Sequence, residues 1–269
     1  MLRGALVLFV LSSTASAGLI DLKGKPIDEF TFAIEGRLWR SELRGDLRVD
    51  DEFIEGTNVD FEEELNLDSE DWSPEAMMLI KAKNILIRGA YVETTFSETD
   101  TVDETFRFDG STFTFSERVD AEVTFRIGGA EIEWLFLNLG SASKVGLEVG
   151  AGVGLRYLSV SARIESETTG IRERTRKNAV TPVVSVSASL GIFNVVRVDL
   201  NVAGIYFDYL GIEGLFLDGA IEAKLFVHHA FYVGLGYRYS GLDLEFRHGD
   251  NVEFNVNLGG SFIGAGLQF

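Results

Sequence analysis

The last nineteen residues of the chain alternate apolar and polar side chains and end on an aromatic residue. From Val252 to Leu258 every second residue is apolar, and the residues between them are Glu or Asn. A period of two is the signature of a β-strand whose two faces meet different surroundings. The apolar positions resume at Ile263 and continue in steps of two to the terminal Phe269. We therefore predict a closing strand from Val252 to Phe269.

Nine further segments carry a strand pattern, which brings the predicted count to ten. They cover about Phe30–Val49, Glu75–Ala82, Ile85–Ser97, Val119–Leu137, Lys144–Glu165, Arg176–Ile192, Val195–Phe207, Glu213–Val227 and Phe231–Arg247. A strand that crosses a bilayer at a tilt needs about 9 to 11 residues, and Glu75–Ala82 is the weakest candidate. An even count puts both chain ends on one side. Residues 83–84, 193–194 and 228–229 are then predicted periplasmic turns, and residues 50–74 and 98–118 outer loops.

Composition excludes the other ways of crossing a membrane. The chain is 46% hydrophobic and 25% charged, with no uncharged apolar run that approaches the about 18 residues of a helical span. Because only helices and closed barrels satisfy every backbone polar group in lipid, a membrane protein without helical spans must be a barrel. The formal charge of −18 argues against nucleic acid as a partner, which requires clustered Lys and Arg. The sequence has no Cys, so no disulfide is expected.

The first residues have the pattern of a secretory signal peptide. Arg3 precedes an apolar run, and Ala15-Ser16-Ala17 fits the A-x-A cleavage pattern. We therefore expect residues 1–17 to be a signal peptide and residues 18–269 to form one barrel domain.

With this start, the alternating segments and the terminal Phe269, the chain resembles the small, porin-type outer-membrane β-barrel proteins of Gram-negative bacteria. The resemblance implies an all-β fold, a transmembrane antiparallel up-and-down β-barrel of about ten strands in the outer membrane. It also implies that outer-membrane lipid surrounds the barrel and that the barrel assembly machinery recognises the last strand through Phe269. The resemblance carries no functional residue across.

The alternation slips in phase at several points within single segments: at Gly128-Gly129, near Tyr157-Leu158, near Gly241 and at Gly260. One extra residue is what a β-bulge inserts, so we interpret the slips as bulges. The alternative is a hairpin turn at Gly128-Gly129, which would raise the strand count to twelve. We favour the bulge, because the two halves of the divided segment would barely reach across a membrane.

A charge on the lipid face near the midplane costs about 2 to 4 kcal/mol, so the charged strand positions are expected to face inward. In the segment from Val119 to Ile127 this puts the apolar residues outside. The same reasoning predicts a lumen charge network of Arg40, Arg44, Arg48, Glu122, Arg126, Glu148, Arg156, Arg197, Asp199, Asp218, Glu222, Lys224 and Arg238. A barrel of this size is mostly filled by its own side chains, which favours a structural network. A narrow path for ions or small solutes is the alternative, because rings of charge also set selectivity.

Residues 50–75 hold twelve acidic residues and no Lys or Arg. We interpret them as a solvated acidic loop. Asn58 to Glu62 resembles the ligand spacing of a calcium loop, but the Gly required at the sixth position is replaced by Glu63. Alternatively, Asp60 caps a short amphipathic helix that tucks Phe61 into the barrel mouth.

A basic cluster, Arg172, Arg174, Arg176 and Lys177, lies between the fifth and sixth predicted strands. It is expected to pair with the acidic loop or to contact lipopolysaccharide phosphates, which suit bidentate arginine. Asp109-Gly110, flanked by two phenylalanines on each side, predicts a hairpin above the membrane that extends the neighbouring strands.

Catalysis has little support. The His residues are His228 and His229, at a predicted turn, and His248, near Asp250 in the last outer loop, and no catalytic motif surrounds them. We expect no cofactor and no metal. The sequence favours a structural or surface-binding role, with a narrow pore as the first alternative and an outer-membrane enzyme as the second.

Overall fold

The computed structural model describes residues 27–49, 57–61, 70–101, 105–114, 116–139, 145–209, 211–246 and 252–269. The predicted signal peptide, residues 1–17, lies outside these ranges. Within them, no helix is long and apolar enough to span a bilayer.

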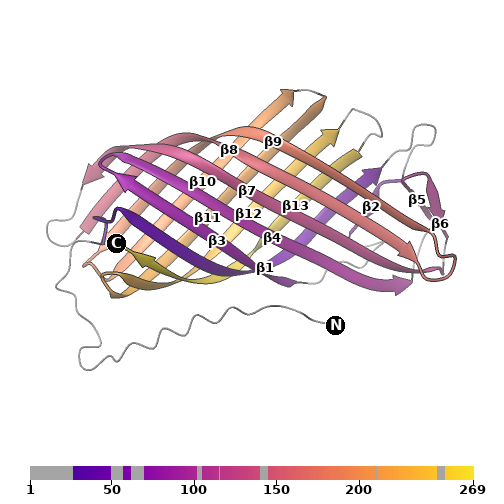
Figure 1. Cartoon of the computed structure of the whole chain (residues 1–269), viewed down its shortest axis with the longest axis horizontal. Helices are drawn as coiled ribbons and strands as arrows, with labels where there is room; N and C mark the ends of the chain where they lie inside the picture. Colours follow the sequence, from indigo (N-terminus) through magenta and orange to yellow (C-terminus); the bar gives the residue numbers. More distant parts are fainter. Residues whose placement is uncertain are drawn as a thin grey trace.

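Ten long antiparallel strands close into a barrel, because the last strand pairs with the first. They are β1 (Phe32–Val49), β3 (Asp71–Ala82), β4 (Ile85–Thr101), β7 (Arg118–Leu139), β8 (Val145–Ser166), β9 (Arg172–Ile192), β10 (Val196–Tyr209), β11 (Ile212–His228), β12 (Phe231–Phe246) and β13 (Val252–Gln268). Figure 1 shows them as two walls whose strands cross at an angle. The ten predicted segments correspond to these ten strands, and the alternative of twelve is wrong.

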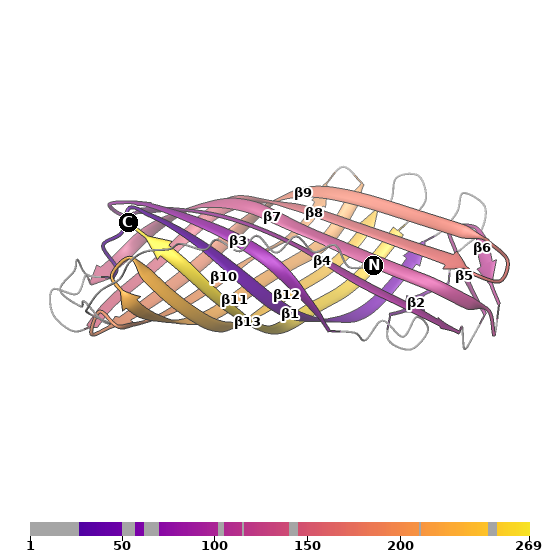
Figure 2. The ribbon, with the colours of Figure 1, turned by 60° about the horizontal axis from the view of Figure 1, so that its bottom comes forward.

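The two ends of the barrel differ. The start of β1 and the end of β13 lie at one end together with the two-residue turn at residues 83–84 and the turn at residues 193–195, and we call this the turn end. The opposite end, the loop end, carries the short strands β2 (Val59–Asp60), β5 (Phe106–Phe108) and β6 (Ser111–Phe113). In Figures 1 and 2 the β5–β6 hairpin lies at the loop end, far from the C-terminus.

The barrel wall exchanges its two faces part-way along the strands. On β8 the outward side chains as far as Tyr157 are mainly apolar, whereas the inward ones include Glu148 and Arg156. From Leu158 to Ile164 the buried, inward side chains are apolar, and the outward ones are polar. The alternation itself keeps its phase across this point, so the polarity of the faces changes and the direction of the side chains does not.

This exchange corrects the predicted bulges. β7 pairs with β4 and β8 in unbroken register through Gly128 and Gly129, which excludes both the bulge and the hairpin turn there. The register is equally continuous at Tyr157-Leu158 and at Gly241. At Gly260 it is continuous with β12, and the pairing with β1 skips Gly260 and Ser261 but resumes without a shift. The register shifts found lie elsewhere, between Leu135 and Leu137 and between Phe226 and His228. The apparent slips in the sequence mark the height at which an apolar exterior gives way to an apolar interior.

The same exchange makes the predicted faces of one segment wrong. On β7 the apolar residues from Val119 to Ile127 point inward and are buried, and Glu122 and Arg126 lie on the outer surface. On the turn-end side of the exchange, apolar residues of β7 face outward as expected, with Ile132 and Trp134 56% and 61% exposed.

The loop-end half of the barrel is filled by apolar side chains. Its largest fully buried residues are Trp39, Phe61, Phe96, Phe106, Phe108, Phe113, Phe125, Phe216, Phe254 and Phe262. Three of these belong to the β5–β6 hairpin, whose Asp109-Gly110 turn has positive φ at both residues, as a type I′ turn requires. The predicted hairpin is therefore present, but it forms a separate sheet that caps the core and does not extend β4 and β7. Phe61 is buried in the same core, next to β2, which pairs with β1; residues 62–69 of the acidic segment lie outside the described residues.

Candidate functional site in the charged lumen

The turn-end half of the lumen holds a dense network of charged side chains. Strand alternation builds it, because residues two apart on one strand both point inward. Its cations are Arg37, Lys81, Arg88, Arg156, Arg197, Lys224 and Arg238, and its carboxylates are Glu35, Glu75, Glu131, Glu133, Glu148, Asp199, Asp218 and Glu222. Most of these side chains are buried, and a buried charge lowers the stability of the fold unless it is paired.

Arg37 is the centre of the first part of the network. Its guanidinium pairs with Glu35, with Glu222 at 2.5 Å and with Glu75 at 3.7 Å. The guanidinium also lies over the ring of Phe262, 4.5 Å from the centroid, which joins the network to the apolar core above it. Arg37 thus connects carboxylates from β1, β3 and β11.

Lys224 continues the network across the barrel. Its Nζ lies 2.8 Å from Glu35, 3.2 Å from Asp199 and 3.3 Å from Glu222. The Tyr232 hydroxyl donates to Glu35 at 2.7 Å. Glu35, Asp199 and Glu222 each contact more than one cation, so replacing one of these charges affects several ion pairs.

Arg238 and Arg156 form the part nearest the exchange of faces. Arg238 Nε donates to Asp218 at 3.0 Å, and its Nη1 lies 3.0 Å from Glu75. Arg156 pairs with Glu131 and approaches Asp218 to 3.8 Å. The Arg238 guanidinium stacks on Trp39 at 4.9 Å, at the boundary with the apolar core.

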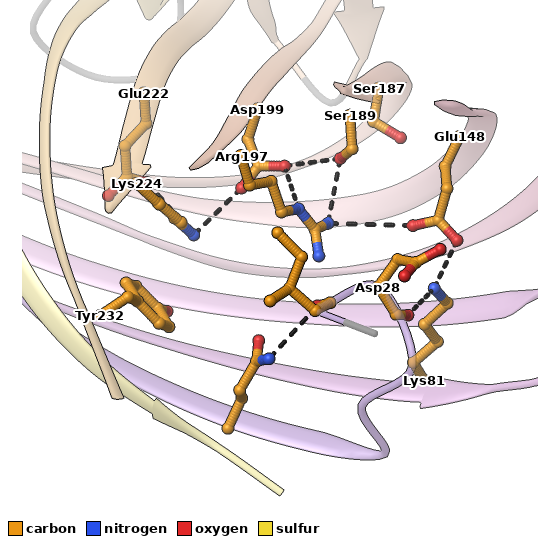
Figure 3. A network of polar contacts seen from close by, with 12 residues as sticks. Asp28, Lys81, Glu148, Ser187, Ser189, Arg197, Asp199, Glu222, Lys224 and Tyr232 are labelled. Carbon is orange, nitrogen blue, oxygen red and sulfur yellow. Dashed lines mark hydrogen bonds and ion pairs between the residues drawn. The ribbon is translucent and has the colours of Figure 1, made fainter. Parts of the chain in front are cut away.

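The turn end of the lumen is stoppered by the residues before β1. Ile27 and Phe30 are buried, and Lys81 Nζ donates to the Asp28 carbonyl at 2.6 Å. Lys81 and Arg197 both lie 5.4 Å from the centroid of the Phe30 ring. Figure 3 shows Asp28 and Lys81 beside Glu148 and Arg197. Residues 27–30, which we call the stopper, are therefore in direct contact with the charge network.

A cavity of about 50 Å³ remains within the charge network, lined by its charged residues and by Met77, Ala90 and Ile127. Glu222 Oε1 and Glu75 Oε2 are buried without a hydrogen-bond partner. A space of this size with polar walls holds a few water molecules, which supply such missing bonds. It is far smaller than the roughly 300 to 1,000 Å³ of pockets that bind drug-sized ligands.

The structure separates the predicted lumen residues into two groups. Glu148, Arg156, Arg197, Asp199, Asp218, Glu222, Lys224 and Arg238 lie inside the barrel. Arg40, Arg44, Arg48, Glu122 and Arg126 lie on the outer surface of the loop-end half, where their expected inward placement is wrong. The cause is the exchange of faces, since a polar side chain above that height faces water.

Sequence reasoning missed several inward charges of β1, β3, β4 and β7. They are Glu35, Arg37, Glu75, Lys81, Arg88, Glu131 and Glu133. The signal was present, because Glu35 and Arg37 alternate with the outward Ile34 and Leu38.

The other predicted site residues lie apart from the lumen. The outer face of β9 exposes Arg172, Arg174 and Arg176. The side chain of Lys177, in contrast, is on the inward face of the strand. The rings of His228 and His229 lie 3.9 Å apart at the turn end, while His248 and Asp250 fall outside the described residues.

No protein-family model and no curated protein matches the chain. Solved structures of outer-membrane barrels do match. The outer membrane protease OmpT from Escherichia coli is similar with a TM-score of 0.54 and 12% identity, over 89% of this chain and 97% of that one. Ail, the attachment invasion locus protein of Yersinia pestis, gives 0.37 and 14%, over 89% and 99%. Neisserial surface protein A gives 0.33 and 11%, over 88% and 97%. At these identities the likeness to OmpT shows the fold: a closed antiparallel β-barrel of 10 strands, as in Gram-negative outer-membrane proteins.

Proposed function

We propose that this protein is an outer-membrane barrel with a sealed lumen, and that its role is structural or surface-binding and resides in the loop-end half. The observation that carries the proposal is the apolar core that fills this half, capped by β2 and the β5–β6 hairpin. A pore needs a continuous water path, and large aromatic side chains occupy the place where it would run.

The outer surface supports a membrane position for the turn-end half only. Its outward side chains are large and apolar, with Val153 at 63% and Leu235 at 66% exposed. Tyr91 and Tyr157, which both pair with Gly128, lie at the upper limit of this belt. Aromatic girdles occupy such interfaces in outer-membrane barrels. The turn end then faces the periplasm, and the loop-end half stands in water outside the cell.

Two partner contacts belong to this proposal. The exposed Phe269, whose backbone pairs with Phe32, would be the signal read by the barrel assembly machinery. Arg176 lies four residues beyond Val180, the partner of Tyr157, and so is the arginine of its row nearest the girdle. We propose that Arg176 contacts lipopolysaccharide phosphates, and the inward position of Lys177 argues against the same role for that residue.

The inward charges neutralise one another by forming ion pairs and hydrogen bonds, which gives the network a structural role. The alternative function is a narrow pore that passes ions through the lumen. Planar-bilayer recordings of the purified protein distinguish them, with a general porin in the same bilayer as the positive control. We expect no steady single-channel conductance from this protein. A stable conductance step with ion selectivity would overturn the sealed lumen and support the pore.

A further inference from the structure

The loop-end half of the barrel has an open seam between β9 and β10. The two strands pair from the turn end only as far as Val184 and Gly204. Beyond that pair β9 continues for twelve residues to Arg172, and among the described residues only β8 pairs with this stretch. Figures 1 and 2 show β9 running past the end of β10. Within the described residues, the stretch 172–183 therefore presents a strand edge with which no second strand pairs.

The sequence of this edge agrees with its exposure. Pro182 lies two residues beyond the last β9–β10 pair, and a proline, which has no N–H, is confined to edge strands in sheets. Arg172, Arg174 and Arg176 occupy the outward positions further along. Charged side chains and proline are the devices by which proteins keep an edge from indiscriminate pairing.

The charges select what this edge can accept. Arg174 lies directly opposite Arg163 of β8, so like charges are adjacent on the outer face. Within the described residues, Arg174 and Arg176 form no ion pair, whereas Arg172 pairs with Glu165. A second copy of the same edge would place arginine against arginine. A strand with acidic outward side chains would neutralise the row instead.

On the inward side of the seam the two strands differ. Ile205 and Phe207 of β10 are partly buried and pack against the apolar core, whereas the inward row of β9 is Glu173, Thr175 and Lys177. A strand added beside β9 would direct every second side chain toward Ile205 and Phe207.

We infer that the 172–183 edge of β9 binds an extended polypeptide segment by strand addition, with acidic side chains facing outward and apolar side chains facing the core. Backbone hydrogen bonds supply affinity in this mode of recognition, and the alternating side chains supply specificity. The inference rests on the proposed surface-binding role and names the kind of partner that it takes. A conducting lumen would refute the sealed barrel and leave this edge untouched, so the two proposals fail separately.

The test uses the full-length protein in detergent micelles and a fluorescein-labelled ten-residue peptide that alternates Glu with Val. A peptide in which Lys replaces every Glu is the charge control, and one with the same composition in two blocks is the pattern control. We expect saturable binding of the alternating acidic peptide alone, weakened by salt because the contacting charges are exposed. Hydrogen exchange should show new protection in residues 172–183 and none in β13, which is paired on both sides.

Two matched variants locate the site. The triple variant R172E/R174E/R176E should weaken binding about tenfold or more, since three attractive charges are replaced by three repelling ones. The triple variant R40E/R44E/R48E makes the same charge change on the outer face of β1 and should bind as the wild type does. Heat-modifiable migration in gels confirms that both variants fold.

Three results would overturn the inference. They are equal binding of the block peptide, equal loss in both triple variants, or peptide binding without protection of residues 172–183. Displacement of the peptide by purified lipopolysaccharide, in a manner that depends on Arg172 and Arg174, would assign this row to phosphate recognition and would also overturn it.

Discussion

Ile127 of β7 lies directly opposite Leu158 of β8, and both side chains point into the barrel. The next pair toward the turn end, Gly128 and Tyr157, belongs to the outer face. These two adjacent pairs mark the height at which the wall changes from an apolar outer face to an apolar inner face. The proposed position in the membrane follows from this boundary.

The boundary predicts that an introduced arginine destabilises the barrel on one side of it and has little effect on the other side of the same strand. Ile263 and Asn255 are both exposed outward residues of β13, on either side of Gly260. Ile263→Arg places a charge in lipid and should cost about 2 to 4 kcal/mol of unfolding free energy. Asn255→Arg, in water, should change it by no more than about 0.5 kcal/mol. Urea unfolding in lipid vesicles measures both values, and equal costs would contradict a boundary at this height.

The strand positions could be predicted from sequence because a period of two identifies a strand wherever its two faces differ. The inward direction could not be. Val119 and Glu122 alternate in the same way whether the apolar face meets lipid or a core, and alternation alone does not state which. The change of pattern at Gly128 contained the information, but a bulge explains such a change equally well until the register is known.

The lumen was predictable below the boundary and not above it. Arg197 and Asp199 alternate with apolar residues on a lipid-facing strand, so their inward direction follows. The partner of each charge does not follow, because Arg37 and Glu222 are 185 residues apart and meet only through the closure of the barrel. The open β9 edge was equally hidden, since it depends on where β10 stops pairing.

The charge network predicts a large effect at its centre. Arg37→Leu would remove the cation that contacts Glu35, Glu75 and Glu222 together, and breaking buried pairs in this way costs about 3 to 5 kcal/mol. Arg44→Leu is the matched control, because the Arg44 side chain is 72% exposed and should contribute about 0.5 kcal/mol or less. Guanidinium unfolding followed by tryptophan fluorescence compares the two. A loss at Arg37 no larger than that at Arg44 would mean that the network is solvated.

The closure between β13 and β1 depends on a missing side chain. A Cβ on Gly260 would overlap the carbonyl oxygen of Arg40, a backbone atom that cannot move aside without disturbing the strand. The Gly260 carbonyl also accepts a hydrogen bond from Trp39 Nε1 at 3.2 Å. Gly260→Ala should therefore destabilise the barrel by about 1 to 3 kcal/mol through overpacking.

The control for this change is Gly36→Ala on the adjoining strand. A Cβ on Gly36 would meet nothing within 4 Å, so the variant should unfold at the wild-type denaturant concentration. Thermal loss of the fast-migrating folded band on gels ranks the three proteins. Equal stability of the two alanine variants would contradict a close approach of Gly260 to the Arg40 backbone.

Glu117 predicts an acid-sensitive attachment of the β5–β6 cap. Its carboxylate accepts hydrogen bonds from the Ser166 hydroxyl, from the Thr114 backbone N–H at 2.8 Å and from the Thr169 hydroxyl at 2.7 Å. These bonds, that of Ser166 first, lower the pKa of Glu117 from 4.5 to about 2. Because these hydrogen bonds stabilise the ionised carboxylate in the folded protein, their contribution to stability is complete above pH 4.5 and is lost as the pH falls toward 2.

At pH 7, Glu117→Gln should lower the free energy of unfolding by about 1 to 3 kcal/mol, the usual range for hydrogen bonds to a charged group. Thermal unfolding of wild type and variant at pH 7, 4.5 and 2 measures the difference, which should shrink only between the last two values. A difference that stays constant down to pH 2 would show that the Glu117 charge does not fasten the cap.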